Sequence, residues 1–283
     1  MTSSSTAGSP TQRRQAAEGS LRSAVRDGGI LTWRYLKRIP RIPELAIFAI
    51  IQSVIFVLLF AFVFGGAIPI PGGGNYKEFL MPGIFAQNMV FAAGTTAIGL
   101  ADDMSKGIID RFRSLPMARS AVLTGRAVSD VIYNAGILVV LMTTGFAVGW
   151  TWHTGFVNFL LGVGLLLLFA FAMSWFGVWF GLSIPSVEVA QQGIFTFMFP
   201  LVFISNVFVP PQTLPDFLQP IAEWNPVSTL TAALRELWGN PNPFGAGSGL
   251  PAEEPALVTL GWVAVFLLVF IPLAVRKYRS VSR

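Results

Sequence analysis

The sequence contains no cysteine and only one histidine, His153. Disulfide bonds, thiolate catalysis and cysteine-based metal sites are therefore excluded, and a single histidine does not build a multi-histidine metal site. The chain also lacks any Gly-Lys pair, so it has no phosphate-binding loop of the type that ends in Gly-Lys-Ser or Gly-Lys-Thr. Motifs of serine hydrolases and zinc peptidases are missing as well. We therefore expect neither a metal site nor ATP hydrolysis on this chain.

Charged residues are scarce too. They make up 12% of the 283 residues, against roughly 25% in an average soluble domain. Hydrophobic residues make up 53%, and they include 25 Phe and 8 Trp. This composition is typical of a chain whose main solvent is lipid.

Six apolar stretches are long enough to cross a bilayer as helices. At about 1.5 Å per residue, each reaches the roughly 30 Å thickness of the hydrocarbon layer. A helix satisfies its own backbone hydrogen bonds, which lipid cannot do. The sequence therefore predicts an all-α polytopic membrane protein with six transmembrane helices, at residues 46–67, 79–101, 128–149, 156–184, 189–209 and 257–275.

The distribution of basic residues predicts the orientation. Of the 19 Lys and Arg residues, 17 precede the first span, separate the second from the third, or follow the sixth. Such a bias places both termini in the cytoplasm of a plasma membrane. It also explains the net charge of +5 without nucleic acid binding. Residues 1–28, rich in Ser, Thr, Ala, Arg and Gly, are expected to form a disordered cytoplasmic tail before a transmembrane domain at 29–283.

Residues 29–41 show the pattern of a helix that lies in the membrane interface. Basic residues gather on one narrow face, and apolar residues occupy the other side. We expect this helix to anchor the chain at the lipid surface through Trp33, Arg34, Lys37 and Arg38.

The predicted cytoplasmic loop at 102–126 contains a second amphipathic segment. Its apolar residues share one face at helical spacing, with Lys106 and Arg113 on the other side. Either the membrane surface and the protein's own spans or a cytoplasmic partner must cover that face, and periodicity alone leaves both open. The apolar residues are Ile108, Ile109, Phe112 and Leu115.

The predicted outer loop at 210–255 is too long for a simple turn. Leu214, Phe217, Leu218 and Ile221 follow helical spacing, and the same spacing returns after Asn225-Pro226. This pattern predicts two short amphipathic helices separated at the Asn-Pro step, and we expect both to fold back against the bundle.

Ionisable residues are almost absent from the centres of the predicted spans. The carboxylates lie near span ends, and Asp130, about one turn inside the third span, comes nearest to an exception. A proton-coupled transporter is expected to need buried carboxylates or histidines near the midplane, so this arrangement argues against proton drive.

Two segments resemble a known family. From Lys106 to Arg119 the chain reads KGIIDRFRSLPMAR, followed by Arg126 and Asp130; from Phe203 to Pro210 it reads FISNVFVP, followed by Asn225-Pro226 and Ala233-Leu234-Arg235. Both resemble the ABC (ATP-binding cassette) type-2 permeases, particularly the drug-export branch typified by the daunorubicin-resistance permeases of actinomycetes. The resemblance extends from Trp33 to Arg279.

The resemblance implies a bacterial six-span subunit that pairs with a second permease copy, as a homodimer, and with two cytoplasmic ABC ATPase subunits. ATP and Mg would bind to those ATPases, with no cofactor on this chain. The loop helix would be the coupling helix seated in the ATPase, which favours the partner over the membrane surface. Its contact residues would be Lys106, Ile108, Ile109, Arg111, Phe112, Arg113 and Leu115, while outer re-entrant helices carrying Asn225, Pro226 and Arg235 would cap the transport path.

The resemblance and the Phe-rich spans favour export of a lipophilic drug, an antibiotic or a lipid. The same architecture exports polysaccharides and lipid-linked glycans, which is the alternative. An intramembrane enzyme would need a catalytic carboxylate pair, a histidine base or a nucleophile motif, and the sequence offers none. The amphipathic loop argues against a passive membrane scaffold.

Overall fold

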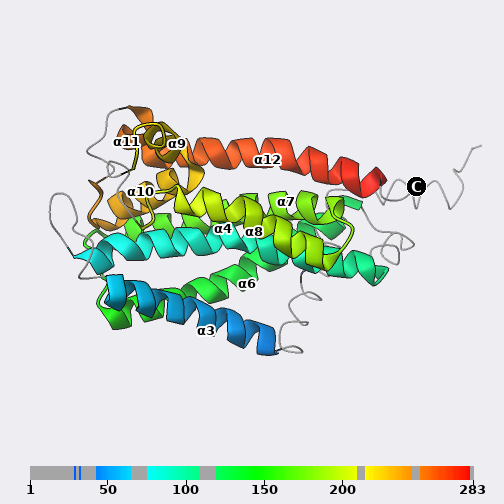
Figure 1. Ribbon diagram of the computed structural model, residues 1–283, viewed down its shortest axis with the longest axis horizontal. Coiled ribbons are helices and arrows are strands. Elements are labelled where there is room, and N and C mark those ends of the chain that lie inside the picture. The colour runs from blue at the N-terminus through cyan, green and yellow to red at the C-terminus, as the bar shows by residue number, and fades with distance from the viewer. Residues whose placement is uncertain are drawn as a thin grey trace, which may run out of the picture.

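The computed structural model is a bundle of helices that lie side by side along its long axis (Figure 1). It describes residues 29, 32, 43–64, 75–108, 119–208, 214–243 and 249–280. The elements that build the bundle are α3 (Pro43–Leu59), continued by the π-helix η2 (Phe60–Phe64), then α4 (Tyr76–Ser105), α6 (Arg119–Val148), α7 (Phe156–Ser183), α8 (Val187–Phe203) and α12 (Pro255–Ser280).

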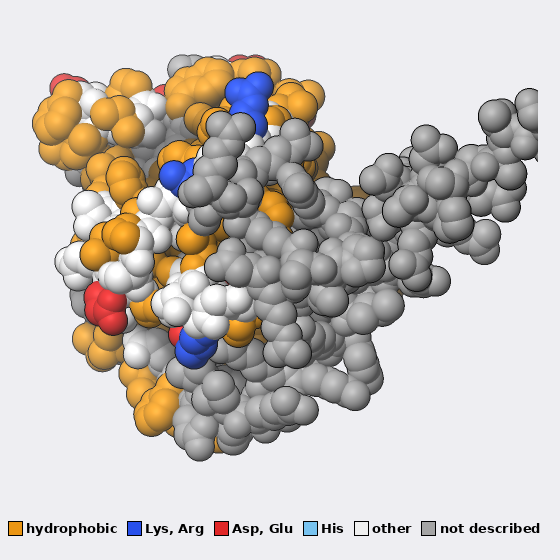
Figure 2. Space-filling view, turned by 90° about the vertical axis from the view of Figure 1, so that its right-hand side faces the viewer, with side chains coloured by type: hydrophobic (Ala, Val, Ile, Leu, Met, Phe, Trp, Pro, Cys, Tyr) orange, Lys and Arg blue, Asp and Glu red, His pale blue; other side chains and the backbone are white. Residues whose placement is uncertain are grey.

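Successive long elements run in alternating directions, so each connection lies at one end of the bundle or the other (Figure 1). We call the end where α4 stops and α6 begins the loop end. The opposite end, which holds the short helices, is called the α10 end. Figure 2 looks onto the loop end and shows basic and acidic side chains among apolar ones.

The all-α prediction is confirmed within the described residues, which contain no strand. Four helices, α4, α6, α7 and α12, are long and apolar enough to cross a membrane, while α3 and α8 supply shorter apolar helices. Several helices extend beyond the predicted spans. For example, α4 begins three residues before the predicted 79–101 and ends four residues after it, because polar residues at its two ends are helical without being apolar.

Small residues allow the two central helices to approach closely. On α7, a Cβ added to Gly177 or Gly181 would overlap the backbone carbonyl oxygens of Ala93 and Ala97 on α4. Only glycine fits at such a contact, which is a common basis of helix packing in membranes. The core of the bundle is therefore built around the α4–α7 pair.

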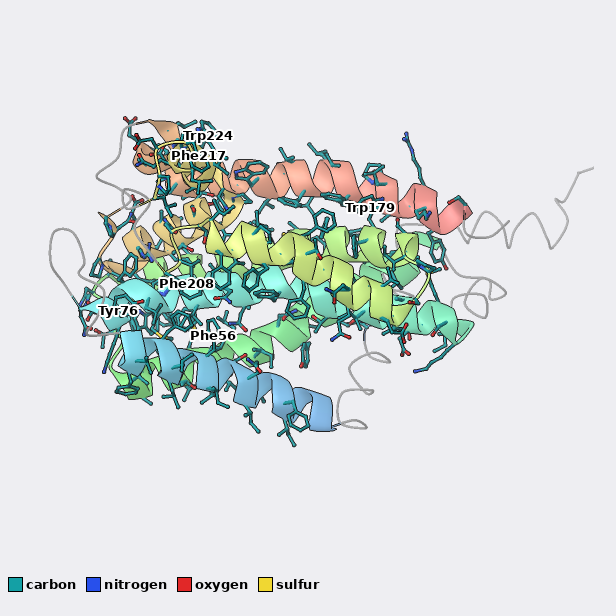
Figure 3. The ribbon with its side chains drawn as sticks, viewed as in Figure 1. Phe56, Tyr76, Trp179, Phe208, Phe217 and Trp224 are labelled. Atoms are coloured by element: carbon teal, nitrogen blue, oxygen red, sulfur yellow. The ribbon has the colours of Figure 1, made fainter. Side chains whose placement is uncertain are left out.

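Three short helices close the α10 end: α9 (Gln219–Trp224), α10 (Pro226–Trp238) and α11 (Leu250–Glu253). The prediction of two outer helices separated at the Asn-Pro step is confirmed. The expected packing is right for α10, nearly all of which is buried against α4, α7 and α12. It is wrong for the apolar face of the first helix, because Phe217 and Ile221 are exposed. Figure 3 shows Phe217 and Trp224 at this corner of the molecule.

Candidate functional site

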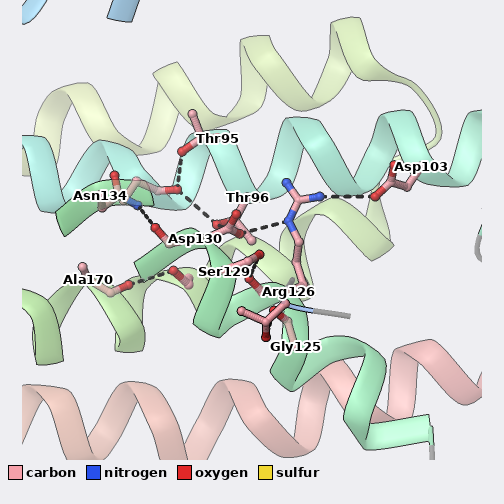
Figure 4. A network of polar contacts seen from close by, with 12 residues as sticks. Thr95, Thr96, Asp103, Gly125, Arg126, Ser129, Asp130, Asn134 and Ala170 are labelled. Carbon is pink, nitrogen blue, oxygen red and sulfur yellow. Dashed lines mark hydrogen bonds and ion pairs between the residues drawn. The ribbon is translucent and has the colours of Figure 1, made fainter. Parts of the chain in front are cut away.

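A buried ion-pair network joins α4 to α6 near the loop end (Figure 4). Arg126 on α6 contacts Asp103 on α4 through Nη1, at 3.2 Å, and Asp130 on its own helix through Nε, at 3.0 Å. Thr96 on α4 donates its hydroxyl to the same Asp130 oxygen at 2.7 Å. The network therefore crosses between the two helices at two points.

A glycine makes room for this network. A Cβ added to Gly99 on α4 would overlap the guanidinium of Arg126, so the arginine lies flat against bare backbone. Both Arg126 and Asp103 are buried. Buried ion pairs add little net stability, because desolvation offsets their attraction, but removing one partner costs about 3–5 kcal/mol. The network thus favours one relative placement of α4 and α6.

The Arg126 network lies beside the loop that joins α4 to α6. Asp103 lies two residues before the end of α4, and Arg126 lies seven residues after the start of α6. The loop that joins these two helices carries the predicted coupling segment. Thr32 also donates its hydroxyl to the carbonyl of Gly125 at 3.1 Å, which ties the region of the predicted interfacial helix to the same point. Thr32 and the loop between α4 and α6 therefore both adjoin residues of the network.

The predicted coupling segment is described only at its start. Lys106 and Gly107 form the turn that ends α4, with Gly107 at a φ of 65°, where glycine is favoured, and Ile108 is again helical. The exposed ion pair between Lys106 and Asp102 contributes little stability. The remaining predicted contact residues lie outside the described residues: Ile109, Arg111, Phe112, Arg113 and Leu115. So do the tail at 1–28 and the predicted lipid anchors Trp33, Arg34, Lys37 and Arg38.

At the α10 end, Arg235 joins three segments of the chain. Its guanidinium is fully buried and donates to the carbonyl of Phe79 on α4 from Nε, at 3.0 Å, and from Nη2, at 2.8 Å. Nη2 also donates to the carbonyls of Asn206 and Val207, which follow α8, at 3.1 and 3.4 Å. The guanidinium carbon lies 3.7 Å from the centre of the Phe79 ring. One side chain of α10 therefore holds the start of α4 against the end of α8.

Backbone carbonyls and an aromatic face, rather than a carboxylate, stabilise this buried charge among the described residues. Burial lowers the pKa of Arg235 to about 9, and interaction with Tyr76 opposes part of that shift. The guanidinium consequently stays protonated at neutral pH. The charge therefore depends on contacts with the start of α4 and with the residues that follow α8.

The predicted Asn-Pro step has a structural role beside Arg235. Asn225 caps α10 by accepting a hydrogen bond from the amide of Val227 at 2.8 Å, and Pro226 takes the first helical position. The Asn225 amide also donates to the carbonyl of Leu201 on α8 at 2.7 Å. Asn225 and Arg235 therefore attach the two ends of α10 to the region where α8 ends.

The turn between α6 and α7 also docks on α10. His153 donates its backbone amide to the carbonyl of Trp238 at 2.8 Å, and Thr154 donates its hydroxyl to the carbonyl of Leu237 at 2.5 Å. The half-exposed imidazole of His153 places Nε2 3.2 Å from a carboxylate oxygen of Glu78. The histidine is therefore a surface contact, and no cluster of three potential metal ligands exists among the described residues.

Sequence reasoning found some of these residues and missed others. It predicted Asn225, Pro226 and Arg235, and the structure places Asn225 and Pro226 at the start of α10 and Arg235 in its last turn. It did not predict the pairing of Arg126 with Asp103, although the four-residue spacing of Arg126 and Asp130 was a signal that one helix face is charged.

Comparison with known proteins identifies similar chains. The ABC-2 type transporter family model matches residues 28–237. A daunorubicin resistance ABC transporter permease protein of Streptomyces coeruleorubidus is 32% identical over 248 residues, which cover 88% of this chain and 84% of the relative. A probable doxorubicin resistance ABC transporter permease protein of Mycobacterium tuberculosis is 24% identical over 271 residues, or 95% and 94% of the two chains. A probable multidrug ABC transporter permease of Escherichia coli is 27% identical over 174 residues, or 58% and 44%.

Proposed function

Because this chain belongs to the ABC-2 type transporter family and is a membrane-spanning permease subunit of an ABC exporter, we propose that it carries a lipophilic, amphiphilic drug out of the cell. The names of two relatives that match most of their length, which refer to daunorubicin and doxorubicin resistance, support this substrate class. The chain itself contributes the path, and a separate cytoplasmic ABC ATPase binds ATP and Mg and supplies the energy.

In this proposal all six long elements cross the plasma membrane, with the loop end in the cytoplasm. Their alternating directions support six crossings, although α3 with η2 and α8 are shorter than the other four. The excess of Lys and Arg in the segments at the loop end supports the orientation. Both termini are then cytoplasmic, and the short helices of the α10 end face outward.

The observation that carries the proposal is the junction of the loop with the Arg126 network. The segment from about Lys106 to Leu115 acts as the coupling helix, with Phe112 inserted into a groove of the ATPase. ATP-driven movement of that helix reaches Asp103, three residues before Lys106, and Arg126, eleven residues after Leu115. The spans then move between inward- and outward-facing arrangements.

A second copy of the permease completes the transporter. The exposed surface of α3 is apolar, but it includes the side chain of Gln52, between Ile51 and Ile55. An amide facing hydrocarbon loses hydrogen bonds that a protein partner supplies. This exposed face supports a homodimer, while the remaining apolar surface lies against lipid.

The test is ATP-dependent drug uptake. The permease is reconstituted with its partner ABC ATPase in inside-out vesicles, and doxorubicin accumulation is followed by fluorescence. We expect uptake that requires both subunits, and we expect Phe112→Asp to abolish it together with co-purification of the ATPase. The matched variant Phe112→Leu keeps the apolar contact and retains both. ATP hydrolysis by the purified permease alone, or normal co-purification of Phe112→Asp, would contradict the proposal.

A further inference from the structure

One face of α8 carries an acid, an amide and three aromatic rings in a single line. The five residues are spaced four, three, four and four positions apart, so they lie within a quarter-turn of the helix. The line is about 22 Å long and runs from the loop end toward the α10 end. Its members, which we call the α8 stripe, are Glu188, Gln192, Phe195, Phe199 and Phe203.

The stripe is an open surface of the described structure. A neighbouring face of α8 packs against the bundle through Ala190, Ile194, Met198 and Val202, all buried. That packing fixes the rotation of α8 and leaves the side chains of the stripe exposed. The three stripe phenylalanines are 50%, 52% and 46% exposed, in chain order.

The aromatic part of the stripe continues beyond α8. Phe199 and Phe203 stack with ring centres 4.1 Å apart, and Phe203 lies 5.5 Å from Phe208. Phe208 stacks in turn on Phe60, at 4.5 Å, in the π-helix η2. Figure 3 shows Phe208 near Phe56, which completes this group at the α10 end. Short π-helices are rare and frequently lie at functional sites.

The order of these side chains has a chemical meaning. The carboxylate stands at the loop end, where it attracts a cation arriving from that side, while Gln192 offers hydrogen bonds. Half-exposed phenyl rings then offer faces on which a flat ring system stacks and edges against which it packs. No basic side chain interrupts the stripe. Acyl chains of lipid neither pair with a carboxylate nor stack on aromatic rings, whereas a flat aromatic cation does both.

We propose that the α8 stripe binds planar aromatic cations and guides them from Glu188 toward the aromatic group at the α10 end. This assignment rests on the drug-export function proposed above, and it specifies which residues select the substrate. The carboxylate pairs with the ammonium group of the substrate at the start of the path. Phe195, Phe199 and Phe203 successively stack on its ring system, so movement along the stripe exchanges one stacking contact for the next.

The chain offers a matched control. Phe197 lies on the same helix and is 59% exposed, but it points to the other side of α8 from the stripe. The experiment compares Phe199→Leu and Phe203→Leu with Phe197→Leu in the reconstituted permease–ATPase complex. Loss of a stacking contact is expected to lower kcat/KM for ATP-dependent doxorubicin uptake by about 3- to 10-fold in the stripe variants. The Phe197→Leu variant is expected to change it less than about 2-fold.

A second variant tests the acid separately. Glu188→Gln is expected to raise KM for doxorubicin but not for its neutral N-acetyl derivative, because only the cation pairs with the carboxylate. For variants that transport too slowly for KM to be measured, drug affinity is compared through binding to the nucleotide-free complex, measured by quenching of doxorubicin fluorescence.

Three results would overturn the assignment. Equal behaviour of Phe199→Leu and Phe197→Leu would show that the stripe faces lipid. A loss in the stripe variants that affects both probes equally and lowers the dimer fraction in native mass spectrometry would make the stripe a contact between copies. If the wild-type complex hydrolyses ATP but neither binds nor transports any drug, the proposed export function itself fails, and the assignment fails with it.

Discussion

Gly99→Ala tests whether the Arg126 network holds α4 and α6 together. In a helix interior, replacing Gly by Ala ordinarily gains about 1 kcal/mol of stability. At position 99, however, the new methyl group would overlap the guanidinium of Arg126, which must swing away from Asp103. Breaking a buried pair costs about 3–5 kcal/mol. We therefore expect a net loss of about 2–4 kcal/mol, or a fall in Tm of roughly 5–10 °C.

The assay is thermal unfolding in lipid nanodiscs, followed by the fluorescence of the eight tryptophans. Gly136→Ala on α6 is the matched control, because a Cβ there meets no atom within 4 Å. It should raise Tm by a few degrees. In an Arg126→Ala background the overlapping atoms are gone, so Gly99→Ala should become stabilising. A Gly99→Ala variant that lowers Tm equally in both backgrounds would refute the reasoning.

Three further predictions concern the α10 end. Arg235→Lys should lower Tm by several degrees in the same assay, because one ammonium group does not reproduce the fork that holds carbonyls of two segments; an unchanged Tm would show that charge alone suffices. Asn225→Ala should cost about 1–3 kcal/mol of stability. Asn225→Asp should cost less, because it keeps the helix cap and loses only the amide donor. Equal losses in the two variants would mean that the cap is unimportant. Partial desolvation and the charge of Glu254 raise the pKa of Glu236, whose side chain stays exposed, so its ionisation lowers stability slightly as pH rises through that pKa. Glu236→Gln should therefore raise Tm at neutral pH, and melting curves below the ordinary Glu pKa should show the advantage vanish.

Helix positions were predictable because the hydrogen bonds and apolar residues that stabilise a membrane helix all lie within one short stretch of sequence. A run of about 20 apolar residues must form a helix in lipid wherever it lies, so the stretches at 79–101 and 156–184 sufficed to predict α4 and α7. Their ends were less predictable. Residues such as Asp102 and Asp103 are polar, yet they remain helical because the turn at Gly107 ends α4 only afterwards.

Contacts between helices carried much weaker signals. Arg126 and Asp103 lie 23 residues apart on different helices, and their pairing depends on how each helix is rotated about its axis. Arg235 was found only through the resemblance to a family. Its partners are backbone carbonyls, which every residue possesses, so no residue type in the sequence marks them.

Amphipathic spacing predicted a helix correctly but not what covers its apolar face. The two outer segments have the same spacing of apolar residues, yet α10 is enclosed by protein, whereas Phe217, just before α9, and Ile221, on α9, are exposed. Periodicity shows that one face of a helix is apolar. It does not show whether protein or lipid covers that face, because either can.

Helix α4 connects the Arg126 network at the loop end with the Arg235 contacts at the α10 end. Its 30 residues extend about 45 Å, and about 36 Å of that length separates Phe79, held by Arg235, from Asp103, held by Arg126. The middle of α4 also packs tightly on α7, which supports the helix between these two contacts. Pro82 removes one helical hydrogen bond beside the Phe79 contact. The first turns of α4 are therefore where the helix bends most easily. If the loop between α4 and α6 acts as the proposed coupling segment, we expect its movement to shift Phe79 against Arg235.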